Sequence, residues 1–146
     1  MADTVRLVEY FYVTAPDKPG EAARALNTLR HAGVNLLAFS GFPQGRRAQL
    51  DFIPADPAAF KQAAKKANWK VVGPRRGFLV HGDDRVGAVA DLLERLAAAK
   101  INVTAIDAVS VADGRYGAIF WVAPKDVKKA AVLLEASASP AATVGT

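Results

Sequence analysis

Cysteine is absent from the 146 residues, and the only histidines are His31 and His81. The lack of cysteine excludes a disulfide framework, a thiol nucleophile and a thiolate metal site. Two histidines without clustered carboxylates do not make a metal site either. We therefore expect this protein to carry no metal and no cofactor.

Long apolar runs are also missing. No run approaches the roughly 18 residues that a membrane-spanning helix requires. Hydrophobic residues nevertheless make up 51% of the sequence, which is ample for a packed core. The first four residues lack the basic region and apolar stretch of a secretory signal. We expect a soluble, cytoplasmic protein with no membrane partner.

The motifs of common catalytic sites are missing too. The sequence contains no G-x-S-x-G nucleophile elbow and no Gly-rich phosphate loop that ends in Lys-Ser or Lys-Thr. Asp83 and Asp84 are adjacent, but consecutive side chains before a helix usually diverge, and no partner base accompanies them. The sequence therefore does not predict an enzyme.

Positive charge is in excess, with a net charge of +5. Basic residues form two groups, each on or beside a predicted helix: Lys61, Lys65, Lys66, Lys70, Arg75 and Arg76, and then Lys125, Lys128 and Lys129. A surface helix needs a solvated face, and no base-stacking aromatic motif accompanies the lysines. We therefore do not expect nucleic acid as a partner. A ferredoxin-like nucleic-acid-binding module and a structural assembly module remain the alternative functions.

The sequence does contain an internal repeat. Shifted by 67 positions, it matches itself through a turn, a helix and the start of a strand. The identical pairs are Asp17 and Asp84, Gly20 and Gly87, Ala23 and Ala90, Leu26 and Leu93, Leu29 and Leu96, Ala32 and Ala99, Asn35 and Asn102, and Ala38 and Ala105. A two-residue insertion then makes the offset 69, which places Gly45 on Gly114 and Leu50 on Ile119. The repeats span residues 1–73 and 74–137, and we expect a flexible tail at 138–146.

Each copy is predicted to run strand, helix, strand, strand, helix, strand. In the first copy we expect strands at 6–14, 35–42, 46–53 and 69–73, a helix from the turn at Asp17 to Gly33, and a helix that starts at Asp56. In the second copy we expect strands at 76–81, 102–111 and 115–123 and helices at 87–100 and 124–136. No final strand is recognisable after Glu135, although residues 141–144 suit a weak one. Gly73-Pro74 is the predicted break between the copies.

This order of elements predicts an α+β fold of the ferredoxin-like kind, βαββαβ repeated twice, with the helices on one face of an antiparallel sheet. The other face should be covered, because the strands carry apolar residues of both parities: Tyr10 and Tyr12 stand beside Phe11 and Val13. A homodimer that stacks two sheets is the simplest cover.

The turn and helix resemble a known family. The segment Asp17-Lys18-Pro19-Gly20, with its helix and the Val34-Asn35 step that follows, resembles the ACT domain, the amino-acid-sensing module of many enzymes of amino-acid metabolism. The second copy keeps Asp84, Gly87 and Asn102 but has Val86 in place of the usual proline. The resemblance implies a tandem, free-standing regulatory protein. It also implies an eight-stranded sheet with four helices on one face.

The resemblance further implies amino-acid sites at the seam between the repeats. One site would combine Asp17, Lys18, Pro19 and Gly20 with Asn102 and Val103, and the other Asp84, Arg85, Val86 and Gly87 with Asn35 and Leu36. No effector domain is recognisable, so the signal would pass to a regulated enzyme or another partner protein.

The chemistry of these residues suits a zwitterion, and each residue also suits a purely structural role. A helix N-terminus with a glycine attracts a carboxylate, and Asp17 or Asp84 can pair with an ammonium group. The same aspartates are also ordinary helix caps, with Pro19 suited to the first helical position. The asparagines suit a turn after a helix. Both readings are compatible, because a cap can hold a loop that touches ligand.

Overall fold

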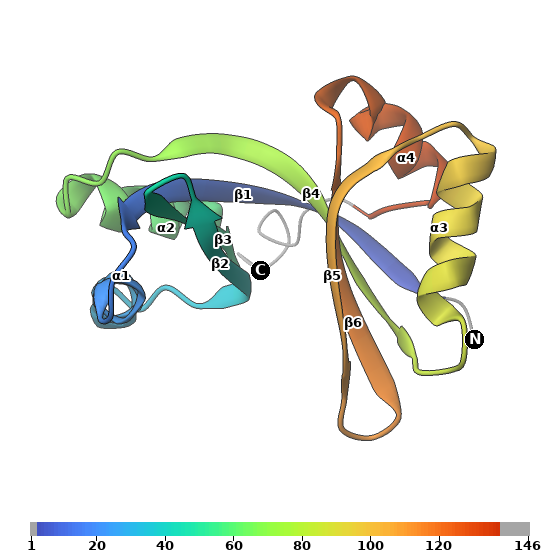
Figure 1. The fold of residues 1–146 in the computed structure, drawn as a ribbon, viewed down its shortest axis with the longest axis horizontal. Coiled ribbons are helices and arrows are strands. Elements are labelled where there is room, and N and C mark those ends of the chain that lie inside the picture. Colours follow the sequence, from blue (N-terminus) through green and yellow to red (C-terminus); the bar gives the residue numbers. More distant parts are fainter. Residues whose placement is uncertain (1–2, 138–146) are drawn as a thin grey trace. The chain divides into compact units, whose positions relative to one another are not determined.

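The computed structural model describes residues 3–137 and has an α+β fold, shown in Figure 1. In chain order the elements are β1 (Thr4–Pro16), α1 (Glu21–His31), β2 (Leu36–Gln44), β3 (Arg47–Pro54), α2 (Pro57–Lys66), β4 (Val72–Asp83), α3 (Ala88–Ala98), β5 (Val103–Val111), β6 (Arg115–Val122), the 3-10 turn η1 (Pro124–Asp126) and α4 (Val127–Leu133). The expected flexible tail, 138–146, lies outside the described residues.

The chain divides into two compact units. The N-terminal unit contains residues 9–75, and the C-terminal unit contains residues 76–137 together with residues 3–8 from the start of the chain. The first half of β1 therefore packs with the second repeat. Val5 is 6% exposed and belongs to the same apolar cluster as Phe78, Leu96 and Phe120.

In the N-terminal unit, β3 lies between β2 and β1 and pairs with both in antiparallel fashion. Phe11 is opposite Phe52, and both side chains are buried. They pack against Leu29 of α1 and against Phe60 of α2, whose ring centroid lies 4.8 Å from that of Phe11. Because Phe11 and Phe52 share one face of the strands, both helices cover that face.

The C-terminal unit repeats this plan with β6 between β5 and β4. Phe78 is opposite Phe120, and their rings stack with centroids 4.9 Å apart. Leu92 and Leu96 of α3 and Ala130 of α4 pack on this same face. In each unit, the apolar side chains of the helices and those of one face of the strands thus pack together in a single core.

The strand ladders revise the offset between the two repeats. The helices α1 and α3 and the strands β2 and β5 differ by 67 positions, as predicted. Gly41 pairs with Leu50 and Ala108 pairs with Ala118, so the third strands differ by 68 positions and the predicted offset of 69 is wrong. The hairpin of the second copy is longer by one residue. The correction matters because a slip of one residue moves every side chain to the other face of a strand.

The described residues form six strands, so the predicted eight-stranded sheet is not observed. One reason is that the predicted strand 76–81 and the last two residues of the predicted strand 69–73 belong to the single strand β4, which continues through the predicted break at Gly73-Pro74. The other reason is the end of the second repeat, where only Ser137 bridges to Arg6. The predicted residues 141–144 lie outside the part of the chain that the structure describes.

Apolar residues on the strand face that points away from the helices are also buried within the chain itself. Ile53 is fully buried and Trp121 is 7% exposed, although they lie on the strand face opposite Phe52 and Phe120. Their burial therefore does not require a second copy of the chain. No helix among residues 3–137 is long and apolar enough to cross a membrane.

Candidate functional site

The turns before α1 and α3 have the same geometry. Gly20 and Gly87 are the N-cap residues, with φ angles of 92° and 83°, and neither helix has a side-chain cap. The predicted capping by Asp17 and Asp84, with Pro19 as the first helical residue, is therefore wrong. Both caps favour glycine because the left-handed region of backbone conformation penalises a Cβ atom. The cause is the backbone conformation and not crowding, since nothing lies within 4 Å of where the Cβ atom would be.

Each turn lines a cavity that also touches the strand that follows the helix. The N-terminal turn cavity measures about 290 Å³, and Asp17, Lys18, Ala22, Phe39 and Phe42 are among its lining residues. The C-terminal turn cavity measures about 280 Å³, and its lining residues include Asp84, Arg85, Gly87, Val89 and Val109. Asp17, Lys18, Ala22 and Phe42 correspond to Asp84, Arg85, Val89 and Val109 at an offset of 67. The repeat therefore carries one cavity twice.

The charges at both turn cavities suit a zwitterion. Each has a carboxylate, Asp17 or Asp84, next to a cation, Lys18 or Arg85. The N-terminal turn cavity is also lined by Glu21, whose carboxylate lies 3.9 Å from the ammonium of Lys18. Neither Asp17 nor Asp84 forms an ion pair with another residue in the described part of the chain. The backbone N–H groups in the first turns of α1 and α3 receive no side-chain cap, so they can attract an anion.

The second turn is held by contacts within its own unit. The backbone N–H of Asp84 donates to the carbonyl of Gly114 at 2.8 Å. The guanidinium of Arg85 lies 3.1 Å from a carboxylate oxygen of Asp91 and 3.5 Å from one of Asp3. Asp91 raises the pKa of Arg85 by accepting its hydrogen bond, and Asp3 adds to this effect. Arg85 therefore stays charged and oriented beside the turn.

The remaining predicted site residues lie in different places. Pro19 and Val86 are exposed in the turns and line neither turn cavity, and Val86 is fully exposed. Asn35 and Asn102 are exposed, and each immediately precedes the second strand of its repeat, which Leu36 or Val103 begins. Within one unit, an 11-residue helix separates the asparagine from the turn, a length of about 16 Å. Neither unit brings its own turn and its own asparagine together.

Sequence reasoning missed the strand residues of the turn cavities. Phe39 and Phe42 in the first copy, and Val109 and Ser110 in the second, complete the walls. Phe42 is 41% exposed and Val109 is 61% exposed, which is unusual for such side chains. The internal repeat predicts that Phe42 and Val109 are equivalent, at an offset of 67. That both lie close to the turns depends on the fold and cannot be predicted from the repeat.

No metal site is evident in the described part of the chain, where no group of three or more His, Asp or Glu side chains is placed to hold an ion.

Comparison with known proteins identifies the fold. No protein-family model matches the sequence, and no curated protein matches it. A protein from Bacteroides thetaiotaomicron has a similar structure, with 17% identity over 90% of this chain and 88% of that chain and a TM-score of 0.77.

Regulatory subunits of aspartate kinase are also similar in structure. The ligand-free subunit from Thermus thermophilus has 15% identity and a TM-score of 0.63, and the subunit from Thermus flavus has 16% identity and a TM-score of 0.58. Both similarities cover 92% of this chain and 95% of the other chain. The fold is thus ACT-like, of the kind found in regulatory domains of aspartate kinase. At these identities the similarity concerns the fold alone.

Proposed function

We propose that this protein is a regulatory protein that binds an amino acid at the turns before α1 and α3. The observation that carries the proposal is the duplication of the turn cavity, with a carboxylate and a cation at equivalent positions in both copies. A cavity of about 280 to 290 Å³ is near the lower end of the range for small-molecule sites, which suits a ligand as small as an amino acid.

The proposed binding mode assigns one ligand group to each feature of the turn. The ligand carboxylate lies against the N–H groups of the first helical turn, which have no side-chain cap, and near Lys18 or Arg85, and the ligand ammonium pairs with Asp17 or Asp84. The ligand side chain contacts Phe42 in the first cavity or Val109 in the second. Asn102 and Asn35, from the opposite repeats, are proposed to complete the first and second sites.

The regulatory part of the proposal is a change in order at the turns. Both turns have exposed backbone and left-handed glycines, so a bound ligand would restrict them and alter the surface that another protein meets. We propose that a free-standing protein of this kind, as a homodimer in the cytoplasm, passes the signal to a partner enzyme or another protein. No catalytic role is assigned to either turn.

The test is a calorimetric titration with each of the twenty amino acids, followed by variants of the exposed apolar wall. Phe42→Glu and Val109→Glu place a carboxylate where the ligand would lie, and repulsion of like charges should raise the Kd of the altered site at least about tenfold. Val132→Glu is the matched control, because Val132 is 78% exposed on α4 and lines neither turn cavity. Equal Kd values in all three variants would contradict the proposed sites.

A further inference from the structure

A second pair of cavities lies beside the first helix of each unit. The N-terminal helix cavity measures about 480 Å³ and is lined by Arg24, Ala25 and Thr28 of α1 and by residues 68–70, which follow α2. The C-terminal helix cavity measures about 470 Å³ and is lined by Asp91, Leu92 and Arg95 of α3 and by Glu135 and Ser137, which follow α4. The helix positions differ by 67, so these two cavities are also equivalent.

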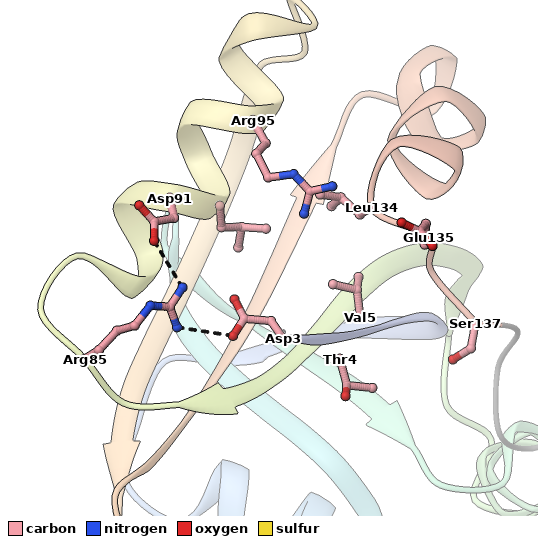
Figure 2. A pocket seen from close by; sticks show the side chains of 10 residues that line it. Asp3, Thr4, Val5, Arg85, Asp91, Arg95, Leu134, Glu135 and Ser137 are labelled. Atoms are coloured by element: carbon pink, nitrogen blue, oxygen red, sulfur yellow. Dashed lines mark hydrogen bonds and ion pairs between the residues drawn. The ribbon is translucent and has the colours of Figure 1, made fainter. Parts of the chain in front are cut away.

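The C-terminal helix cavity carries its own counter-charges, as Figure 2 shows. The guanidinium of Arg85 lies between the carboxylates of Asp3 and Asp91 and forms an ion pair with each. Arg95 donates to the carbonyl of Leu133 at 2.9 Å. With Glu135 included, three carboxylates face two guanidinium groups, so this cavity has no excess of positive charge.

The N-terminal helix cavity has no carboxylate at these three positions, and two of them carry cations. At an offset of 67, Lys70 replaces Asp3, Arg24 replaces Asp91, and Asn68 replaces Glu135. Arg47 adds a third cation and donates through Nη2 to the carbonyl of Thr14 at 3.3 Å. Cations thus occupy two of the three positions where the C-terminal helix cavity has carboxylates, and a neutral amide occupies the third.

One carboxylate, that of Glu21, lines the N-terminal helix cavity, and it is already shared. It lies 3.6 Å from Arg24 and 3.9 Å from Lys18. Lys70 forms no ion pair with any residue among 3–137. The cavity therefore has a net positive charge, which an anion from solution would neutralise.

The floor of the same cavity is apolar and rigid. Val13, Leu50 and Trp69 line it, and the first two are buried. The Trp69 ring lies 5.7 Å from the ring of Phe52 and 6.2 Å from that of Phe60, measured between centroids, so the core fixes its position. An apolar wall with a few charged groups at the rim is the usual composition of a small-molecule site.

We propose that the N-terminal helix cavity binds a small organic anion. The anionic head lies at Arg24, Arg47 and Lys70, and the apolar body lies against Trp69. This proposal does not rest on the proposed amino-acid function, because Arg24, Arg47 and Lys70 do not line the N-terminal turn cavity, although the two cavities share Glu21 and Leu50. The C-terminal helix cavity does not bind the same anion, since Asp3 and Asp91 occupy the positions of Lys70 and Arg24.

The test uses phenyl phosphate and benzoate as probes, with inorganic phosphate and phenol as partial analogues. The chain has two tryptophans, so an NMR spectrum of protein labelled with nitrogen-15 contains two indole N–H signals. Trp69→Phe identifies the signal of Trp69. At least one of the two organic anions should shift the Trp69 signal in a saturable way and leave the Trp121 signal unchanged. Inorganic phosphate and phenol should each bind at least about fivefold more weakly, since each lacks one half of the recognised group.

Variants test the role of charge. Lys70→Gln should weaken binding at least about fivefold, as expected for loss of one partly exposed charge contact. Lys66→Gln removes an exposed lysine of α2 that does not line the cavity, and it should leave the Kd unchanged. Two results would overturn the proposal: no shift of the Trp69 signal with either organic anion, or equal weakening by the two lysine variants. Neither result bears on amino-acid binding at the turns, which the Phe42 and Val109 variants test.

Discussion

The hydroxyl of Tyr116 donates a hydrogen bond of 2.8 Å to the carboxylate of Asp3, which lies 113 residues earlier in the chain. Tyr116 is 4% exposed, and the same carboxylate pairs with Arg85 beside the second turn. The contact fastens the first described residues of the chain to the C-terminal unit. It also links the C-terminal turn cavity, which Tyr116 lines, to the C-terminal helix cavity, which Asp3 lines.

The first prediction concerns Tyr116 at high pH. Burial, together with the bond to Asp3, raises the pKa of Tyr116 from 10.0 to about 12. The folded state therefore retains this proton after the unfolded state has lost it, so stability is present below pH 10 and decreases as pH rises towards 12. Tyr116→Phe should cost about 1–2 kcal/mol at neutral pH and should lose less stability over this range. Urea unfolding at several pH values measures both effects, and equally steep losses in the two proteins would contradict the assignment.

A second prediction concerns Gly82, over which Asp3 packs. A Cβ atom at residue 82 would overlap Oδ1 of Asp3 and would lie 2.7 Å from Cε1 of Tyr116. Gly82→Ala should displace Asp3 and lower the free energy of unfolding by about 1–3 kcal/mol. Gly117→Ala is the matched control, since its nearest neighbour would be at an ordinary 3.7 Å. The cost of Gly82→Ala should shrink in an Asp3→Gly background, and an unchanged cost there would show that Asp3 is not the obstacle.

A third prediction separates two aspartates that both precede helices. Oδ1 of Asp56 accepts hydrogen bonds from the N–H groups of Ala58 and Ala59 at 3.1 and 3.2 Å. Asp56→Ala should therefore cost about 1 kcal/mol of stability. Asp17 caps no helix, so Asp17→Ala should change stability by less than about 0.5 kcal/mol. Denaturant unfolding of both variants decides the matter, and a larger loss for Asp17→Ala would restore the predicted cap.

A fourth prediction concerns His81 at low pH. Burial lowers the pKa of His81 below 6.5, and the nearby positive charges of Arg6 and Arg115 lower it further. The unfolded state then binds the proton first, so this contribution to stability is present above pH 6.5 and decreases as pH falls below it. Stability should decline less on acidification in His81→Gln. An NMR titration of the imidazole checks the direction, and a midpoint above 6.5 would contradict it.

The local sequence predicted most of the helices and strands, because the patterns that indicate them extend over only a few residues. The predicted helix 87–100 is observed as α3 at Ala88–Ala98. The predicted strand 102–111 is observed as β5 at Val103–Val111. The apolar period and the breaks at glycine carry this information without reference to the rest of the chain. The continuity of β4 through Gly73-Pro74 was not predictable in this way, since both residues usually interrupt a strand.

Features that depend on contacts between distant parts of the chain could not be predicted from the sequence. Residues 3–8 belong to the first repeat by sequence, yet Val5 packs in the core of the second. The exposed Phe42 and Val109 line the turn cavities, and only the fold places them beside the turns. The offset of 69 came from matching Gly45 with Gly114, whereas the hydrogen-bonded ladder requires 68. Similar residues at a hairpin turn do not determine the register of its strands.

Amino-acid binding at the duplicated turns is tested most directly by a thermal-shift screen of all twenty amino acids at millimolar concentration. A ligand at 100 times its Kd stabilises the folded state by about 2.7 kcal/mol, so at least one amino acid should raise Tm by several degrees. That gain should fall in Phe42→Glu or Val109→Glu and persist in Val132→Glu. A Tm unchanged by every amino acid would contradict the claim.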